Sequence, residues 1–312
     1  MPTLKEIKGR ISSVQNTLKI TSAMKLVSSA KLRKAQVAIE AMRPYEAQLQ
    51  RILELVRGKD ASMKWADFMD RRAQSAAPST EWAENEDAVK KQVVIIAMAS
   101  NSSLCGGFNA NIIAKAKELL KEYPHAVVYS VGRKMADAMR KVGYPSPVDY
   151  SALSERPSFG PASALAGKLM EDYQDGKVER VFLVYNHFVT AAKQLPVVEQ
   201  FLPVCHADAV CHSERSEESA SAIANLTHRE ADVILEPDAK ALLEALVPKT
   251  IKLKLYAALL DNAAAEHAAR TIAMQTATDN GEDLLGELTL QYNKGRQQKI
   301  TAEILDLAGG QL

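Results

Sequence analysis

Apolar residues recur at alternating steps of three and four through the first 57 residues of this chain, the spacing of a coiled-coil helix. The series runs Leu4, Ile7, Ile11, Val14, Leu18, and then Leu32, Ala35, Ile39, Met42, Leu49, Leu53 and Val56. A continuous helix over this segment would be roughly 80 Å long at about 1.5 Å per residue. Such a rod is too long for a compact domain, so the segment predicts an extended coiled coil with a kink at Pro44.

The apolar series changes between residues 21 and 28. The seam positions there carry Thr21, Lys25 and Ser28, and a displaced apolar stripe appears beside them, formed by Ile20, Met24 and Val27. A displacement of this kind is expected where the surface that a helix meets changes. We therefore expect a change of partner at this point of the helix.

Residues 236–312 return to a helical pattern, interrupted only by Pro248 and by isolated glycines. Nine alanines lie between Ala257 and Ala277, so this part of the helix has a slim surface that a second helix can approach closely. The two ends of the chain can therefore pair as an antiparallel coiled coil.

The middle of the chain follows a different pattern. Residues 58–91 read as an irregular linker or insertion, and residues 92–204 contain short β-branched runs at 93–100, 126–132 and 178–186, with helical patterns between them. Strands that alternate with helices predict a parallel sheet covered on both faces. A further strand is expected at an edge because Pro196 cannot donate to a ladder. Residues 205–235 are polar and read as a loop.

The expected fold is therefore α/β. Long N- and C-terminal helices, over 1–57 and 236–312, form an antiparallel coiled coil, and a Rossmann-like open α/β domain is inserted between them.

Composition narrows the class of protein. With 47% hydrophobic residues, 39 basic and 38 acidic residues, the chain is globular and has no bulk charge that would favour nucleic acid. Three cysteines are too few for a disulfide scaffold. The charged N-terminus does not resemble a secretory signal and no apolar run is long enough to span a bilayer, so we expect membrane contact only through partners.

Charge is nevertheless uneven along the first helix. Seven basic residues and no acidic residue lie between Ile7 and Ile39, namely Lys8, Arg10, Lys19, Lys25, Lys31, Arg33 and Lys34. A helix face of one sign favours an acidic partner, although a solvated basic face is an alternative. Nucleic acid is disfavoured because no aromatic residue lies between Met1 and Arg43.

No catalytic cluster emerges from the sequence. The loop after the first strand, SNSSLCGGFNAN, lacks the lysine and spacing of a phosphate loop, so Gly106 and Gly107 are interpreted as turn residues and Cys105 as a buried side chain. The six histidines are scattered, and no cofactor or metal is expected. An enzyme would need convergent polar groups at the carboxyl ends of the strands, where we find only Ser100, Asn101 and the glycines. A coiled-coil scaffold would leave the inserted domain unexplained.

Long motifs resemble the gamma subunit of the F-type rotary ATP synthases. They are IKGRISSVQNTLKITSAMKLVSSAKLRKAQ, LCGGFNANI, LEPDAKALLEAL, EHAARTIAMQTATDNG and QYNKGRQQKITAEILDLAGG, which cover both ends and the core of the middle. The resemblance implies a non-catalytic central stalk that couples proton- or sodium-driven rotation to ATP synthesis or hydrolysis. Its coiled coil would lie inside a ring of alpha and beta subunits. Its α/β domain would rest with the epsilon subunit on the membrane c-ring, at the cytoplasmic face of a bacterial inner membrane.

The resemblance also implies residue roles. An acidic loop of the beta subunit would press on the shaft near Met24 and Lys25, and further ring contacts would come from Arg270, Arg296, Gln297, Thr301 and Glu303. Glu236 matches the foot that faces the membrane rotor. The chain departs from the family at Ser102 and Ser103, where a charged residue and a glycine are usual, which puts the local contact in doubt.

Cys205 and Cys211 have the spacing of a regulatory cysteine pair found in chloroplast-type relatives, after Leu202-Pro203. A flexible polar loop could bring the two sulfurs together as a redox pair. The acidic flanks of the chloroplast-type loop are only loosely matched by HSERSEES, so a passive insertion is the alternative.

Overall fold

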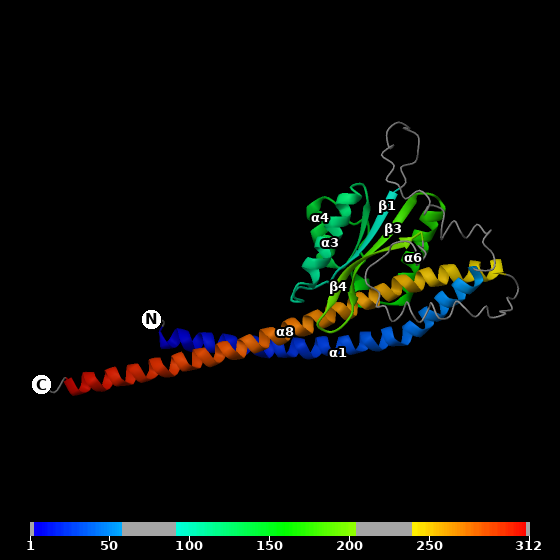
Figure 1. Cartoon of the computed structure of the whole chain (residues 1–312). Helices are drawn as coiled ribbons and strands as arrows, with labels where there is room; N and C mark the ends of the chain where they lie inside the picture. The colour runs from blue at the N-terminus through cyan, green and yellow to red at the C-terminus, as the bar shows by residue number, and fades with distance from the viewer. Residues whose placement is uncertain (1–2, 58–91, 204–238, 310–312) are drawn as a thin grey trace.

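The structure, a computed structural model, describes residues 3–57, 92–203 and 239–309. It consists of a long pair of helices with an α/β domain on one side (Figure 1). The pair is formed by α1 (Leu4–Arg57) and α8 (Ala239–Gly309). Ala35 and Ile39 of α1 pack against Leu260 and Ala264 of α8, whereas nearer the start of α1 Thr21 meets Thr278. Because residue numbers rise along one helix as they fall along the other, the pairing is antiparallel, as predicted.

Prolines and glycines interrupt neither helix. Helix α1 runs through Pro44, and α8 runs through Pro248, where we expected an interruption. A proline inside a helix costs about 3 kcal/mol. In α8 this cost is offset by packing, because Val247 and Ile251, on either side of the proline, are both buried against the sheet.

The glycines of α8 create close approaches to α1. A Cβ atom placed on Gly281 would lie 2.7 Å from Leu18 Cδ2, and one placed on Gly295 would lie 3.2 Å from Leu4 Cδ2. Glycine at these positions lets the leucines of α1 fill the space beside the α8 backbone. The seam is therefore close-packed along the first turns of α1 despite the interruptions that the glycines suggested.

Two of the three polar seam positions of α1 face inward with the apolar ones, and the third, Lys25, is half-buried. Thr21 and Ser28 are 9% and 3% exposed, and Thr278 Oγ1 donates to Thr21 Oγ1 at 3.0 Å. Short hydroxyl side chains keep the heptad seam intact, because their polar atoms find partners between the helices or on their own helix. The displaced stripe is consequently turned outward, and Ile20 and Val27 are 61% and 57% exposed.

A four-stranded sheet forms the centre of the α/β domain, in the order β2-β1-β3-β4. Its strands are β1 (Gln92–Met98), β2 (Val127–Val131), β3 (Val178–Phe188) and β4 (Gln194–Leu202). Strand β1 is parallel to β2 and β3, whereas β4 is antiparallel to β3. The predicted edge strand with Pro196 is confirmed, and its direction makes the sheet mixed rather than fully parallel.

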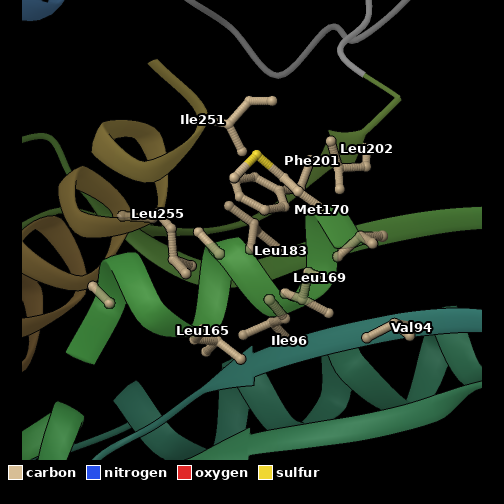
Figure 2. Packing of buried hydrophobic residues seen from close by; sticks show 14 of the residues in the cluster. Val94, Ile96, Leu165, Leu169, Met170, Leu183, Phe201, Leu202, Ile251 and Leu255 are labelled. Carbon is tan, nitrogen blue, oxygen red and sulfur yellow. The ribbon is translucent and has the colours of Figure 1, made fainter. Parts of the chain in front are cut away.

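Helices cover both faces of the sheet, as predicted. Alternate residues of β1 point to opposite faces: Ile95 and Ala97 pack toward α3 (Phe108–Glu122) and α4 (Arg133–Val142), whereas Val94 and Ile96 pack toward α6 (Phe159–Gln174) and α8. In Figure 2, Ile251 of α8 and Met170 of α6 lie around Phe201 of β4. The same helix therefore packs on the sheet at its start and pairs with α1 further along.

The sequence analysis did not anticipate α6, nor the short α5 (Ser151–Glu155) before it. Helix α6 contains Gly160, Pro161 and Gly167, which weaken a helical signal. It forms because Leu165 and Leu169 are buried between the sheet and α8.

Candidate functional site

The outer surface of α1 combines positive charge with exposed apolar side chains. Lys25 and Met24 are half-buried, and the other six basic residues are exposed. Within the described residues, none of the seven forms a salt bridge. Leu26 and Val37 are 69% and 58% exposed, in addition to Ile20 and Val27. A merely solvated face would have no need of these apolar side chains, so the mixture favours contact with another protein.

The end of α8 extends past the start of α1 (Figure 1). Gly295 lies against Leu4, and the ring-contact candidates beyond it, Arg296, Gln297, Thr301 and Glu303, are all exposed. Ile300, Ile304, Leu305 and Leu307 are also exposed, by 47% to 77%. A helix end with apolar side chains on its surface, which none of the described residues covers, is typical of a segment that another chain covers.

Removing residues 301–312 is expected to change the free energy of unfolding of the chain by less than about 0.5 kcal/mol, because the described side chains removed are all exposed. Urea unfolding of the full chain and the truncated chain measures the difference. As a control, Leu288→Ala, at a position of α8 that is 6% exposed, is expected to cost about 2–5 kcal/mol. A truncation as costly as the control would mean that the tip packs back on the protein.

The side chain of Arg270 is buried and points toward the α/β domain. It is 9% exposed, its Nη1 donates to Glu266 Oε1 at 2.7 Å, and its Nη2 donates to Ser102 Oγ at 2.9 Å. Ser102 belongs to the loop that follows β1, so this arginine joins the α/β domain to the shaft. Its contact with a surrounding ring, implied by the resemblance, stays a prediction.

The loop after β1 lies directly on α8. Leu104 and Gly106 have positive φ angles of 67° and 58°, and a Cβ atom on Gly106 would be 3.9 Å from Ala273 Cβ. Cys105 is buried against α8, as predicted, in a cluster with Phe108 and Ala265. The alanine-rich part of α8 therefore packs against both α1 and this loop.

Polar side chains at the carboxyl end of β1 bind other parts of the chain. Ser100 N donates to Asn109 Oδ1 at 3.1 Å, Asn101 Nδ2 donates to Ser151 O at 2.8 Å, and Arg133 N donates to Asn101 Oδ1 at 3.0 Å. These bonds hold neighbouring loops together. In the part of the chain that the structure describes, no cluster of three or more His, Cys, Asp or Glu residues could hold a metal.

A second junction joins the end of β3 to α8. The backbone N–H of Asn186 donates to Asn262 Oδ1 at 3.2 Å, and His187 Nδ1 hydrogen bonds to Asp261 Oδ2. This bond to Asp261 raises the pKa of His187, although burial and the charge of Arg43 oppose the effect. Neither this junction nor Glu266 was predicted from the sequence. A signal was nevertheless present, because Asn262, Glu266 and Arg270 follow one another at intervals of four residues in an alanine-rich stretch and so share one helix face.

The environment of His267 lowers the pKa of its side chain, in contrast to that of His187. Burial, together with the positive charges of Arg270 and Lys31, lowers the pKa of His267 to about 4. In the unfolded chain the imidazole would have its usual pKa of about 6.5. Protons therefore bind preferentially to the unfolded chain as the pH falls from about 6.5 to 4, and stability is lost over that range.

A His267→Leu variant is expected to lose less stability than the parent between pH 7 and pH 4, by up to about 3 kcal/mol. Urea unfolding at several pH values measures the difference. His187→Gln should show the opposite trend, because a raised pKa contributes stability below the unfolded pKa that is lost as the pH rises through the folded one. His125→Gln, at an exposed position, controls for the removal of a histidine from the surface. Equal acid sensitivity of parent and His267→Leu would contradict this assignment.

Three of the residues singled out in the sequence, Cys205, Cys211 and Glu236, lie outside the described residues. The possible redox pair and the foot contact therefore stay predictions. None of the described helices combines the length and apolar character needed to cross a bilayer.

The arrangement of two long helices with an α/β domain on one side agrees with comparisons to known proteins. A family model described as ATP synthase matches residues 3–311. The ATP synthase gamma chain of Phocaeicola vulgatus is 42% identical over 317 residues, covering 100% of both chains, and that of Bacteroides thetaiotaomicron is 41% identical over 320 residues, also covering 100% of both.

Solved structures share the fold. In the rotor of the Euglena gracilis mitochondrial ATP synthase, the matching chain is 19% identical, with a TM-score of 0.58 and coverage of 95% of this chain and 98% of that one. A chain of the OSCP/F1/c-ring assembly from the same organism matches with a TM-score of 0.61 at 20% identity, covering 99% of this chain and 93% of that one. With a full-length match to the family and more than 40% identity to gamma chains, this chain belongs to the ATP synthase gamma-chain family and is a non-catalytic, central-stalk subunit.

Proposed function

We propose that the α1–α8 pair is a rotating shaft inside a ring of alpha and beta subunits, and that the α/β domain rests with the epsilon subunit on the membrane c-ring. Ion flow would turn the shaft, and rotation would drive ATP synthesis or, in reverse, be driven by hydrolysis. The protein would be peripheral, at the cytoplasmic face of a bacterial inner membrane. The observation that carries the proposal is the exposed basic and apolar surface of α1, together with an end of α8 that extends past α1 and that no described residue covers.

The shaft would meet the ring at two levels. At the first, Met24 and Lys25 lie beside the exposed Ile20 and Val27, a surface suited to an acidic loop of the beta subunit. At the second, Arg296, Gln297, Thr301 and Glu303 present polar groups from the lone end of α8. Glu236 would face the membrane rotor from the foot.

Asymmetry is what allows such a shaft to act. Along residues 4–49 of α1 the shaft has two helices of different composition, and beyond Gly295 it has only one among the described residues. A ligand or partner shifts a conformational equilibrium only through contacts that differ between the states. As the shaft turns, each beta subunit would meet a different face, and its affinity for nucleotide would change accordingly.

Neutralising the basic face is expected to weaken coupling without unfolding the protein. In the triple variant Lys19→Gln, Lys25→Gln and Arg33→Gln, ATP-driven proton pumping per ATP hydrolysed should fall, because each charge at the surface contributes about 0.2–1 kcal/mol to a contact with an acidic partner. Pumping and hydrolysis are measured with the assembled complex in vesicles. The matched control replaces Lys117, Lys121 and Lys141, which are exposed on the α/β domain, by glutamine. Equal coupling in both variants would contradict the role of this face.

The partner assignment has a direct test in affinity purification of the full chain from native membranes. Recovery with alpha and beta subunits is the expected result. Recovery of the chain alone, from membranes that contain both subunits, would contradict the proposed function.

A further inference from the structure

Four buried polar side chains are spread over about half of the circumference of α8, among alanines. Asp261, Asn262, Glu266 and Arg270 are 9%, 3%, 6% and 7% exposed. Buried polar and charged groups are costly unless they are bound, so partners hold each of them in place. Three of the four bind the α/β domain directly, and Glu266 binds Arg270. This set of four residues is called the polar face of α8 below.

The first attachment lies at the end of β3. Asn262 Oδ1 accepts the backbone N–H of Asn186 at 3.2 Å, and Asp261 binds His187 on the next residue of the strand. Strand β3 is an interior strand, paired with β1 on one side and with β4 on the other. A force on this attachment therefore reaches the whole sheet.

The second attachment lies at the loop after β1. Arg270 Nη2 donates to Ser102 Oγ at 2.9 Å while Glu266 holds Nη1. The carbonyl oxygen of Ser102 accepts the hydroxyl of Ser100 at 2.5 Å and Nδ2 of Asn109 at 3.5 Å. The loop is therefore bound to the end of β1 and to the first turn of α3, so it cannot move independently of the domain.

Between the two attachments, the side chains through which α8 contacts the α/β domain are apolar. Ala265 and Ala269 of α8 meet Cys105, Phe108 and Phe188 of the α/β domain. Apolar contacts have no preferred direction, whereas hydrogen bonds weaken steeply when they are bent. Within this stretch, the polar bonds are therefore the contacts most sensitive to sliding of the domain around α8, whereas nearer the start of α8 apolar packing and the Lys254–Glu199 salt bridge at 2.9 Å also hold the domain.

The attachments are also separated along the helix. Asn262 and Arg270 are eight positions apart, which at about 1.5 Å per residue is roughly 12 Å. Further along α8, Thr278 and Gly281 contact α1 instead. Because Leu260 and Ala264 also pack against α1, the polar face lies in the stretch of α8 that contacts both the α/β domain and α1.

We propose that the polar face of α8 is a torsional latch: its bonds at Asn186, His187 and Ser102 fix the angle of the α/β domain on the shaft, and Glu266 is a positioning residue for Arg270. The inference rests on the proposed function, because the latch matters only if torque enters through the α/β domain and leaves along α8. The hydrophobic packing of the first part of α8 on the sheet holds the domain on the helix, and the latch sets its angle.

The test measures how much the angle of the α/β domain on the shaft fluctuates in the complete ATP synthase complex. In a chain whose Cys205 and Cys211 are replaced by serine, a thiol probe attached through Lys141→Cys, an exposed position of the α/β domain, reports the angle of the domain while the head is stalled by a non-hydrolysable nucleotide. The double variant Ser102→Ala and Asn262→Ala removes one bond from each attachment. Loss of the hydrogen bond from the charged Arg270 raises the population of the detached arrangement at Ser102 roughly tenfold, and loss of the neutral Asn186–Asn262 bond has a smaller effect. The angular distribution should therefore broaden relative to the parent.

Two single variants serve as controls. Ser103→Ala changes the neighbouring exposed serine, and it should leave the distribution as in the parent. Ser102→Thr retains a hydroxyl that can accept from Arg270, and it should fluctuate less than Ser102→Ala. A purely structural defect would lower the yield of assembled complex, and it would not follow this order among assembled molecules.

The possible outcomes separate the two proposals. A parent complex that assembles and pumps, with a double variant that fluctuates no more than Ser103→Ala, would overturn the latch alone. A parent chain that did not assemble with alpha and beta subunits would overturn the proposed function and the latch with it. A broader distribution in the double variant, with Ser102→Thr close to the parent, would support the latch.

Discussion

Replacing Gly132 by alanine is expected to prevent the α/β domain from reaching its native packing. Gly132 immediately precedes α4, has a φ of 99°, and a Cβ atom placed on it would lie 2.1 Å from the carbonyl oxygen of Ala99. The neighbouring atom is backbone at the end of the central strand β1, so no rotamer change can relieve the overlap. We expect a loss of more than about 4 kcal/mol, in the range reserved for the most disruptive substitutions.

Gly143→Ala is the matched control. Gly143 has a nearly equal φ of 95° at the end of α4, yet no atom lies within 4 Å of the position of its missing Cβ. Only the backbone conformation opposes this substitution, at about 1–2 kcal/mol. Urea unfolding of the two full-length variants separates the overlap from the strain. Equal losses in the two variants would show that the chain near Ala99 moves to admit a methyl group.

The outline of this fold is readable from the sequence because its signals are long. The heptad series of α1 predicted an inward seam, and Ile7, Ala35, Ile39, Leu49 and Leu53 are indeed buried. The β-branched runs predicted β1, β2 and β3, since each strand is covered on both faces and therefore contains few polar residues. Long patterns average out the local exceptions that mislead shorter ones.

Elements that depend on tertiary contacts were less predictable. Helix α6 has a weak local signal and is held by the burial of Leu165 and Leu169 between the sheet and α8. Continuity of α8 through Pro248 likewise depends on packing on both sides of the proline. Neither contact is visible in a local pattern, because the partners come from distant parts of the chain.

The buried position of the Arg270 side chain is the clearest example of a feature that depends on tertiary contacts. A helical pattern places Arg270 on the same face as Asn262 and Glu266, but it does not say which element covers that face. The cover is the loop after β1, and Ser102 in that loop accepts from the guanidinium. The exposed residues at the end of α8 raise no such question, because nothing in the described part of the chain covers them.

Arg270→Ala is expected to cost about 3–5 kcal/mol in the free energy of unfolding of the full chain, because it leaves the carboxylate of Glu266 buried without its partner. Glu266 is 6% exposed, and burial raises its pKa even with Arg270 present. Without the arginine the carboxyl group should accept a proton more readily still. The defect should therefore be larger at pH 8 than at pH 5, where protonation removes the unpaired charge, and urea unfolding at both pH values measures it.

A double variant shows whether the cost arises from the missing attraction or from the charge left behind. Combining Glu266→Leu with Arg270→Met removes both charges and fills the space with apolar side chains, and such replacements of buried pairs are often close to neutral. The double variant should consequently be more stable than Arg270→Ala alone and should not share its pH dependence. If instead the double variant were the less stable of the two, the pair itself would contribute net stability. In that case the bond of Arg270 to Ser102 across the junction would be the first contribution to measure, with Ser102→Ala in the parent and in the double variant.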